Sequence, residues 1–580
     1  MAIKKFDFDV VVLGAGGAGC AAAITAARNG VSVALISKES IAMGNTRICE
    51  AEMTSSGIST GDSPDIIKED MIKGGEYLNN LELVDLIATN ASYAISFVES
   101  LGHFFRRDEE GRLSAKAANR LGGHSFHRSF ISPGSGVSLA HALRNAIANT
   151  SSIAVFEDIL ATCLFQQGDE VQGTLAVDLK TSNCLVLRAK ATILATGGCG
   201  WLYYPQTTNN RSATGDGYAI AFEAGAKLID MEMVQFFPFA MNHPLHYAGT
   251  ILEEPILAGP KGKLINGLGE IVVDRDINRM TRAQVTTLMA KEIAAGRITK
   301  WGGLKIDLSE NLDIPEMIHY KKVNDERKRF EKVRLAYGEN AFNWKEPWDV
   351  SPSAHYMMGG VKIDPEGRSS LKNLYAVGEV AGGAMGANRL GSTSVADIFI
   401  MGMGAGSESA RCATRSENLE IKKSLIAEEV ERVEGLFGKK GTRPPIKIKR
   451  ELQQLMRENV GIVRDEKRLS YALSEIDRMQ DEMENDMCTS DIRRYNTDFL
   501  DAVELMNMLT CAKMITTSAK MRNESRGAHL RLDFADKDDA NWLKNIVIWK
   551  EDGQMRTLVS EITAIEIYEK AKKDDHHKRV

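Results

Sequence analysis

The sequence has 580 residues, a net charge of -6 and an apolar fraction of 43%, as in ordinary soluble globular proteins. Because a single hydrophobic core stops growing at about 250–300 residues, we expect three or four domains. The charge balance and the lack of a basic stripe with interleaved aromatic residues argue against nucleic acid as a partner.

The first predicted unit, residues 8–37, has the pattern strand, glycine-rich turn, helix and strand. Its sequence is FDVVVLGAGGAGCAAAITAARNGVSVALIS, with a Gly-x-Gly-x-x-Gly motif at Gly14, Gly16 and Gly19. Gly14 permits the tight turn, Gly16 lets the backbone approach a pyrophosphate, and Gly19 lets the helix pack closely. The N-terminus of the helix attracts the negative charge. Since the motif lies between a strand and a helix, it predicts a nucleotide-binding, Rossmann-like domain.

The second strand of this unit does not end in the acidic residue that usually holds a ribose. It reads ISKES, with Ser37 at the usual position and Glu39 two residues later. We therefore expect Ser37 or Lys38 to contact the nucleotide, and we do not expect simple NAD binding.

A second contact with the same nucleotide is predicted further along the chain. Residues 150–198 alternate apolar and polar residues, as strands do, and end in ATILATGG. Gly197 and Gly198 would let the backbone come close to the ligand. The next segment, RSATGDGYAIAFEAGA, predicts a turn into a helix, where Asp216 either caps the helix or holds a ribose hydroxyl.

The rest of the chain divides into an insertion, a returning strand and helices. Residues 236–345 mix helix and loop, and the strand pattern returns over 361–379. After about residue 415 the pattern is helical and rich in charge. The sequence thus predicts an α/β fold, in which an insertion interrupts a Rossmann-like domain and a helical domain and a small C-terminal region follow. The predicted bounds are 1–235 and 346–415 for the interrupted domain, 236–345 for the insertion, 416–523 for the helical domain and 524–580 for the C-terminal region.

Two glycine-rich segments each carry one cationic or potentially cationic side chain. HYMMGG, residues 355–360, contains His355, and GANRLGSTS, residues 386–394, contains Arg389. The planar guanidinium group of Arg389 can donate two parallel hydrogen bonds to a carboxylate. The two segments therefore predict a carboxylate ligand between them.

Together, these motifs resemble those of fumarate reductase and succinate dehydrogenase flavoproteins. The segments occur in the order that is typical of the family: VVLGAGGAGCAAAITAARNG, ATGG, ATGDGYAIAFEAGAKLIDMEMVQFFP, HYMMGGV, NLYAVGEVAGG and GANRLGSTS. In addition, ESRGAHLRLDFADKDDANWLKN, residues 524–545, is similar to the end of the flavoprotein subunit in multi-subunit enzymes. The resemblance covers nearly the whole chain.

The resemblance implies an FAD-dependent oxidoreductase that interconverts a saturated and an unsaturated carboxylic acid by hydride transfer at flavin N5. The insertion would be a capping domain that closes over the substrate, and the helical domain would dock beside an iron–sulfur subunit. His355 and Arg389 would bind a substrate carboxylate with Gly391 beside them, and Arg282 in TRAQV would donate the proton. The residues expected to hold FAD are Gly14, Gly16, Gly17, Gly19, Ser37, Lys38, Asn45, Thr46, Gly197, Asp216, Glu379 and Ser392.

Two departures from the family concern the cofactor and the substrate. In GNTRICEAEM, Asn45 stands where the membrane-bound enzymes attach FAD through a histidine, so we expect dissociable, non-covalent FAD. In VQFFPFA, Phe237 replaces a histidine that helps to bind the substrate's other carboxylate, and Phe239 replaces a threonine. One carboxylate-binding half of the pocket is thus retained, and the other half is more apolar.

Two further departures concern protons and charge. The family's glutamate–arginine proton relay maps to GTILEEPILAGPKGKLING, where Glu254 or Glu253 is the candidate glutamate and Lys261 the candidate cation. Glu50 and Glu52 stand where glycines usually face the flavin. They would lower the flavin potential, bind a cationic group or a proton, face away, or pair with Arg47.

Other residues of the motifs carry less specific predictions. His124 in LGGHSFHRSF is expected near the flavin, since the family has Gly-Gly-His there. Arg526 and His529 in the C-terminal segment are expected to be structural or interface residues.

The function predicted from these residues is a catalytic flavoprotein subunit that passes electrons between a carboxylic acid and an iron–sulfur partner. The acid is either a simple dicarboxylate or a larger, less symmetric one. One alternative is other chemistry on the same frame, as in an amino-acid oxidase or an adenylylsulfate-reductase-like subunit. Another is an electron-transfer or assembly subunit that holds FAD without its own substrate. The retained Arg282, His355 and Arg389 favour the first.

The apolar segments and the cysteines of the sequence predict where in the cell the protein is located. The start MAIKKFDFD lacks a secretory signal, and no run of eighteen apolar residues occurs. We expect a cytoplasmic protein, or one peripheral to the inner face of the membrane through its partners. Eight scattered cysteines form no C-x-x-C pair, which argues against a zinc site or an iron–sulfur cluster within the chain. We therefore expect no metal.

Overall fold

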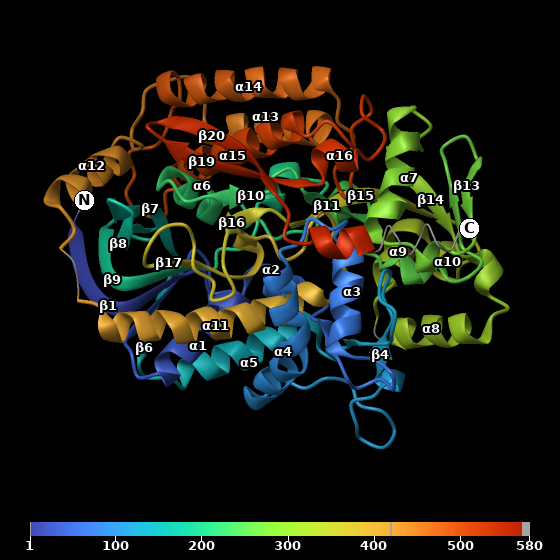
Figure 1. The fold of residues 1–580 in the computed structure, drawn as a ribbon. Helices are drawn as coiled ribbons and strands as arrows, with labels where there is room; N and C mark the ends of the chain where they lie inside the picture. Colours follow the sequence, from blue (N-terminus) through green and yellow to red (C-terminus); the bar gives the residue numbers. More distant parts are fainter. Residues whose placement is uncertain (1, 327, 418–419, 571–580) are drawn as a thin grey trace.

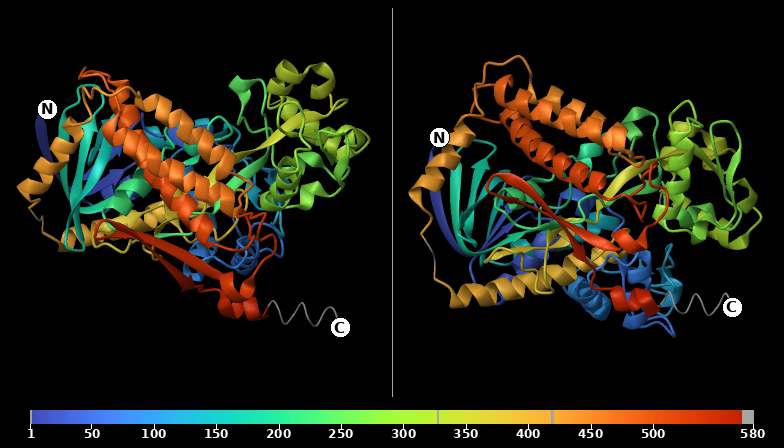
Figure 2. Two further views of the ribbon diagram at one scale, coloured as in Figure 1. Left: turned by 90° about the horizontal axis from the view of Figure 1, so that it is seen from above. Right: turned by 45° about the horizontal axis from the view of Figure 1, so that its top comes forward.

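The computed structural model describes residues 2–326, 328–417 and 420–570. Its parallel strands and helices confirm the predicted α/β class. Figures 1 and 2 show a larger body, a smaller part (green) that projects from one end of the body, and C-terminal helices and a hairpin (orange to red) that lie across it. The smaller part corresponds to the predicted insertion and is called the cap below.

The main sheet has seven strands and contains the Rossmann-like unit. In spatial order these are β6 (Ile153–Glu157), β2 (Val33–Ser37), β1 (Ile3–Leu13), β9 (Cys184–Leu194), β8 (Glu170–Asp178) and β7 (Ile159–Gln167), with β17 (Leu374–Ala376) paired to β9. β1 runs parallel to both β2 and β9. Val10, Val11 and Val12 of β1 are completely buried, as expected for the centre of a parallel sheet that is covered on both faces.

Two helices beside this sheet pack so closely that their backbones are in contact. They are α1 (Gly17–Arg28) and α11 (Thr393–Arg415). A Cβ atom on Gly402 would lie 2.7 Å from the carbonyl oxygen of Ala18, and one on Gly406 would lie 2.4 Å from that of Ala22. Glycine is therefore required on α11, and the close packing places Gly402 beside the start of α1.

Three further helices complete this side of the body: α3 (Pro64–Gly74), α4 (Leu81–Ser100) and α5 (Ser135–Ala148). Among the described residues, α4 alone is long and apolar enough to cross a membrane by length and composition. Half of its most apolar window is buried inside the fold, as in a core helix.

A second sheet joins distant parts of the chain. Its order is β18 (Ala381–Gly382), β16 (Gly360–Lys362), β10 (Leu228–Ile229), β19 (Lys544–Glu551) and β20 (Gln554–Glu561). Leu228 of β10 is paired with Ile548 of β19. The C-terminal hairpin is thus a structural part of the body rather than an appendage.

The cap has its own sheet and hydrophobic core. The sheet order is β11 (Val234–Ala240), β15 (Trp348–Met357), β14 (Leu304–Asp307), β12 (Lys263–Ile265) and β13 (Ile271–Asp274). The buried core residues of the cap extend from Phe237 to Val350 and form a cluster apart from the main core. The insertion predicted from the sequence is therefore a separately packed unit, joined to the body by β11 and β15. Its helices are α7 (Arg282–Ala294), α8 (Pro315–Glu326), α9 (Glu331–Tyr337) and α10 (Glu339–Phe342).

The helical part is formed by α12 (Lys423–Glu434), α13 (Pro445–Asn459), α14 (Glu466–Asn485) and α15 (Thr497–Met521). α15 packs against α6 (Asp216–Glu223), so this part contacts the nucleotide-binding body directly. The remaining elements are α2 (Gly44–Ile48), α16 (Asp539–Trp542), the small sheet of β3 (Met53–Thr54), β5 (Ser129–Phe130) and β4 (Ala118–Asn119), and 3-10 turns at Ala115–Ala117, Gly200–Tyr203, Leu245–Tyr247, Pro255–Ala258, Ile277–Arg279, Ser309–Asn311 and Gly378–Val380.

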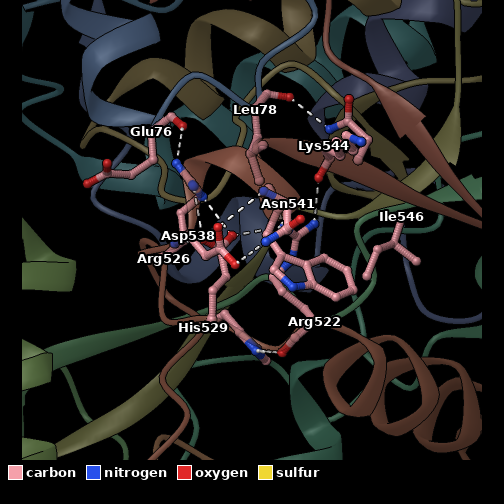
Figure 3. Close-up of polar contacts among 12 residues, drawn as sticks. Glu76, Leu78, Arg522, Arg526, His529, Asp538, Asn541, Lys544 and Ile546 are labelled. Carbon is pink, nitrogen blue, oxygen red and sulfur yellow. Dashed lines mark hydrogen bonds and ion pairs between the residues drawn. The ribbon is translucent and has the colours of Figure 1, made fainter. Parts of the chain in front are cut away.

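Buried charges hold the C-terminal segment onto the body (Figure 3). Arg522 is completely buried and forms ion pairs with Glu232 at 2.7 Å and Glu524 at 3.1 Å. Arg526 binds Glu524 at 2.8 Å, and Nε2 of His529 lies 3.2 Å from the carbonyl oxygen of Arg522. Removing one member of such a buried pair costs about 3–5 kcal/mol. The contacts agree with the structural role predicted for Arg526 and His529.

Candidate active site

One continuous cavity runs from the start of α1 to the junction of cap and body. It is lined by Arg282, Glu254, His355, Arg389 and Phe237 and by the residues expected to hold FAD, with the exception of Gly19; Gly391 does not line it either. Gly19 instead packs against the first turn, since a Cβ atom there would lie 1.8 Å from the carbonyl oxygen of Gly14. The motifs are hundreds of residues apart in sequence and converge on this cavity.

The cavity begins at backbone atoms of the glycine motif. Gly14 has φ +105°, and a Cβ atom there would lie 2.2 Å from the carbonyl oxygen of Ala195. The backbone N–H of Gly17 donates to Oγ1 of Thr46 at 2.9 Å. Gly197 has φ +75° with open space where a Cβ atom would stand. Backbone groups at the N-terminus of α1, with glycines on both sides, fit the pyrophosphate of a dinucleotide such as FAD.

Lys38 is held by carboxylates rather than standing free. Its ammonium group lies 2.8 Å from Asp216 and 2.8 Å from Glu504 of α15. Burial opposes the charge on Lys38, but the two carboxylates outweigh it and raise its pKa. Lys38 therefore lines the cavity as part of a fixed network and not as a lone cation.

Asp216 is the first residue of α6, and the residue before it, Gly215, is the N-cap. The alternative in which Asp216 caps this helix is therefore wrong. Its carboxylate accepts hydrogen bonds from Thr214 at 3.0 Å and Asn507 at 2.8 Å, in addition to Lys38. Glu504 and Asn507 were missed by the sequence reasoning, because no local signal links α15 to a residue nearly 300 positions earlier.

Asn45 lies on α2 and is fixed by the loop that follows the main sheet. Its side-chain amide donates to Oδ1 of Asn209 at 2.6 Å and accepts from the backbone N–H of Asn210 at 2.8 Å. Nearby, Glu379 accepts from the backbone N–H of Met357 at 3.0 Å. Burial raises the pKa of Glu379 to about 7.

The N-cap residue of α11, Ser392, has the left-handed φ of +64°, and its hydroxyl group is 2.6 Å from that of Ser129. The preceding residue, Gly391, accepts a hydrogen bond at its carbonyl oxygen from His124 Nε2 at 2.9 Å. Burial lowers the pKa of His124 to about 4, so the ring is neutral. His124 therefore positions the loop before α11, and its location near the flavin stays a prediction.

Two buried arginines meet at the other end of the cavity. Oε1 of Gln235 accepts from Nη1 of Arg282 at 2.9 Å and from Nε of Arg389 at 3.3 Å. Burial and the neighbouring Arg282 lower the pKa of Arg389 to about 9. Gln235 was also missed by the sequence reasoning. Its amide oxygen accepts a hydrogen bond from each guanidinium group, and this holds the two cations close together.

Arg282 is oriented by its helix and by a carboxylate. It is the first residue of α7, whose N-terminus is closed by a capping box between Thr281 and Gln284. Its Nε donates to Oε2 of Glu254 at 3.0 Å, and its Nη2 binds the other carboxylate oxygen. This two-point pairing fixes the plane of the guanidinium group.

His355 lies at a bulge in the strand pair that joins cap and body. Gln235 pairs with Tyr356 and Phe236 pairs with Ala354, so His355 is the extra residue of β15. A bulge re-aims the side chain of the extra residue. Nδ1 of His355 is 2.7 Å from the hydroxyl oxygen of Thr208. Burial, followed by the two arginines, lowers the pKa of His355 well below its usual value, so the ring is neutral rather than cationic.

Aromatic and acidic side chains lie beside these cations in the cavity. The ring of Phe237 lies 5.2 Å from that of His355, and the guanidinium of Arg282 lies 4.8 Å from the Phe237 ring centre. Glu50 pairs with Arg329 of the cap, so the pairing with Arg47 is wrong. Glu52 accepts from the side chain of Asn119 at 3.1 Å.

The ion pairs of the cap contradict the role predicted for Lys261 in the proton relay. Lys261 forms an ion pair with Asp313, whose side chain is 70% exposed, and it does not approach Glu254. The candidate cation of the relay is therefore not Lys261. Arg329, which no motif marks, contacts Glu253 at 2.9 Å.

Comparisons with known proteins agree with this arrangement. The family model described as FAD binding domain matches residues 9–395, and the model described as Fumarate reductase flavoprotein C-term matches residues 449–574. The chain is 35% identical to a subunit of the fumarate reductase (CoM/CoB) of Methanothermobacter marburgensis, over 94% of this chain and 98% of that relative. It is 30% identical to the fumarate reductase flavoprotein subunit of Haemophilus influenzae, over 97% and 95%.

Solved structures show the same similarity. The FrdA chain of E. coli quinol fumarate reductase superposes with a TM-score of 0.85 and 28% identity, over 96% of this chain and 97% of that one. Adenylylsulfate reductase from Archaeoglobus fulgidus has a TM-score of 0.77 at 18% identity, over 97% and 96%, and shares the fold. The chain belongs to the family of fumarate reductase and succinate dehydrogenase flavoprotein subunits, which are FAD-dependent oxidoreductases acting on carbon–carbon bonds.

Proposed function

We propose that the enzyme reduces or forms the double bond of an unsymmetrical unsaturated acid, with one carboxylate and an uncharged, partly apolar remainder. The observation that carries this proposal is the kind of side chain that surrounds the two cations in the cavity. Arg282 and Arg389 meet at Gln235, and the groups beside them are the ring of Phe237, which packs on Arg282 and His355, and the carboxyl group of Glu254. A second carboxylate on the substrate would meet an aromatic ring and like charges, which is unfavourable.

The substrate carboxylate would bind Arg389 and His355. Arg389 offers charge-assisted hydrogen bonds. Neutral His355 donates from Nε2 when the hydroxyl group of Thr208 donates to Nδ1, so Thr208 selects the useful tautomer. Arg389 is buried and His355 is half-buried, which makes each hydrogen bond stronger than it would be in water.

The proton would come from Arg282. FAD supplies or accepts the hydride when it is bound. Arg282 lines the same cavity as Arg389 and is aimed by Glu254 and Gln235, so it can donate a proton to the adjacent substrate carbon. The nearby cations also stabilise negative charge that develops on the substrate carboxylate.

FAD would be bound without a covalent bond to the protein. The residues at the flavin end that the motifs predict are amide, hydroxyl and carboxyl groups of Asn45, Thr46, Glu379 and Ser392. The two hydrogen bonds of the Asn45 amide are made to the protein, so this side chain shapes the cavity.

Electrons would be exchanged with an iron–sulfur protein. This follows from the relatives, which are named as subunits of fumarate reductases and of succinate dehydrogenases. We place the protein in the cytoplasm or at the inner face of the membrane, attached through its partners. Co-purification of an iron–sulfur protein with the native protein is the test, and its absence would contradict this assignment.

The substrate proposal is tested with the isolated holoprotein. The bound flavin is reduced without oxygen and mixed with fumarate or with monocarboxylic 2-enoic acids of increasing size, while flavin absorbance is followed. We expect reoxidation by at least one monocarboxylic acid to be about tenfold or more faster than by fumarate. Faster reoxidation by fumarate would contradict the proposed substrate class, and no reoxidation by any acid would contradict the proposed reaction.

A further inference from the structure

A line of charged side chains leads from the buried Arg282 to the edge of the cap. The side chains of Arg282 and Glu254 are 7% and 9% exposed. Glu253 is 4% exposed, Arg329 is 20% exposed and Glu50 is 31% exposed. Access to solvent therefore increases over the last two members of the line.

Successive members of this line are in contact. Arg282 is paired with Glu254 through both carboxylate oxygens. The backbone N–H of Glu254 donates to Oε1 of Glu253 at 3.0 Å, which folds the Glu253 side chain back against its neighbour. Nη1 of Arg329 lies 2.9 Å from Oε2 of Glu253, and Nη2 of Arg329 binds Glu50.

A proton donor at Arg282 must recover its proton from solvent after each turnover. Arginine is a weak acid, so it serves only when connected groups reprotonate it. The ion pairs of the described residues connect Glu254 to Arg282, and Glu253 to Arg329. Lys261 is engaged with Asp313. Among the described residues, Arg329 is thus a cation that lies in ion-pair contact with Glu253 and can serve this task, whereas Lys332 acts on Glu253 only through its charge.

We infer that Glu253, Arg329 and Glu50 form the route by which solvent protons reach Glu254 and then Arg282. The inference rests on the proposed role of Arg282 as the proton donor. Arg282 gives one proton to the substrate carbon, Glu254 returns one to Arg282, and Glu253 passes one to Glu254 through a water molecule. Glu50 and Arg329 deliver one proton from solvent to Glu253. Each group ends as it began, and both electrons travel with the hydride.

The ionisation of Glu253 suits this role. Burial raises the pKa of its carboxyl to about 7, and the adjacent Glu254 carboxylate acts in the same direction. The Tyr320 hydroxyl group and the Lys332 ammonium group oppose the shift, as does the ion pair with Arg329. A carboxyl poised near neutral pH can both hold and release a proton there.

The route spans two parts of the molecule. Glu253 and Arg329 belong to the cap, with Arg329 between α8 and α9, whereas Glu50 follows α2 of the body. The contact between Arg329 and Glu50 exists only while the cap lies against the body. Proton supply is therefore complete only while the cap and the body are in contact.

The test compares Glu253→Gln, Arg329→Gln and Glu50→Gln with Lys261→Gln as a matched cap control. The reduced holoenzyme is mixed with an acid that reoxidises the wild-type flavin, in H₂O and in D₂O, from pH 5.5 to 8.5. We expect the Glu253 and Arg329 variants to be about 10²-fold slower with a larger solvent isotope effect, and the Glu50 variant to be less affected. The wild-type rate should fall as pH rises through about 7, and Glu253→Gln should lose this dependence.

Each outcome separates the route from the proposed reaction. Wild-type reoxidation with variants that match Lys261→Gln in rate and isotope effect would overturn the route alone. Absence of wild-type reoxidation with every acid would overturn the reaction and the route together. Since Glu50 is on the surface, its variant should keep the fold, and an unchanged isotope effect in it and in any folded Glu253 variant also counts against the route.

Discussion

The two ends of the cavity are lined by different kinds of chemical group. At the end nearest α1, the contacts are made mainly by the backbone, with Gly14 pressed against Ala195 and the helix N-terminus open to the ligand. At the far end, the contacts are made by side chains, and Arg282, Glu254 and Arg389 are all charged and buried. Backbone conformation and close packing therefore define the end near α1, whereas the pairing of buried charged side chains defines the far end.

This difference explains why cofactor and substrate can change independently. A backbone cradle depends on φ and on the absence of Cβ atoms, so it withstands substitutions elsewhere. A cluster of buried charges depends on every member, because an unpaired charge costs several kcal/mol. Selectivity for the acid should therefore respond to single side chains, while FAD binding should not.

The largest effect is expected from Arg282→Gln. Loss of the proton donor should lower the rate of acid reduction by about 10³-fold, whereas bound FAD and its absorbance stay unchanged. Lys261→Gln, also in the cap, serves as the control and should retain full activity. Steady-state turnover with reduced dye as donor measures this, and a decrease below tenfold would assign the proton donation to another group.

The next effect tests the backbone end. Gly14→Ala places a Cβ atom 2.2 Å from the carbonyl oxygen of Ala195 at φ +105°, so we expect a loss of about 3 kcal/mol or more and protein purified without FAD. Gly197→Ala has a positive φ but open space, so only about 1 kcal/mol should be lost. Flavin content and thermal unfolding measure both. Equal behaviour of the two variants would show that steric contact is not the cause.

A smaller effect is expected from Phe237→His at the side-chain end. A histidine there adds a hydrogen-bond donor where the wall is aromatic, so the rate ratio of fumarate to a monocarboxylic acid should rise about 10- to 100-fold. Phe237→Leu keeps the wall apolar and should leave the ratio near the wild-type value. Ratios of kcat/KM for the two acids give the result, and an unchanged ratio in Phe237→His would separate this wall from substrate choice.

The smallest effect concerns pH and the loop before α11. The pKa of His124 falls from its ordinary 6.5 to about 4 on folding, so the folded state binds fewer protons in this range. The stabilisation is complete above pH 6.5 and is lost as pH falls toward 4, by about 1–3 kcal/mol. Thermal unfolding of the holoprotein between pH 4.5 and 8 should show the decline. His124→Gln should flatten it, and an identical slope in this variant would assign the decline to other groups.

Local motifs were sufficient to predict the backbone end. The turn at Gly14, the helix that starts after it and the second approach at Gly197 each depend on a short stretch of sequence. The insertion that the sequence predicts packs around an apolar core of its own.

The side-chain end could be predicted only in part. Arg282, His355 and Arg389 were found because they lie in motifs, but Gln235 and Arg329 acquire their roles through contacts with distant residues. The neutral state of His355 likewise depends on burial and on two neighbouring arginines. Sequence patterns report periodicity and turns, whereas these features depend on three-dimensional proximity and on local dielectric.

The pairing of β10 with β19 has a consequence for synthesis. The second sheet of the body cannot be completed until Ile548 has left the ribosome, although its first partner, Leu228, is made 320 residues earlier. At roughly 5–20 residues per second, this interval is about 16–64 s. During that time the strand edge of the body is unpaired and open to other chains. The nascent chain can therefore aggregate through this strand edge until its C-terminal part is translated, and chaperones should engage it in that interval.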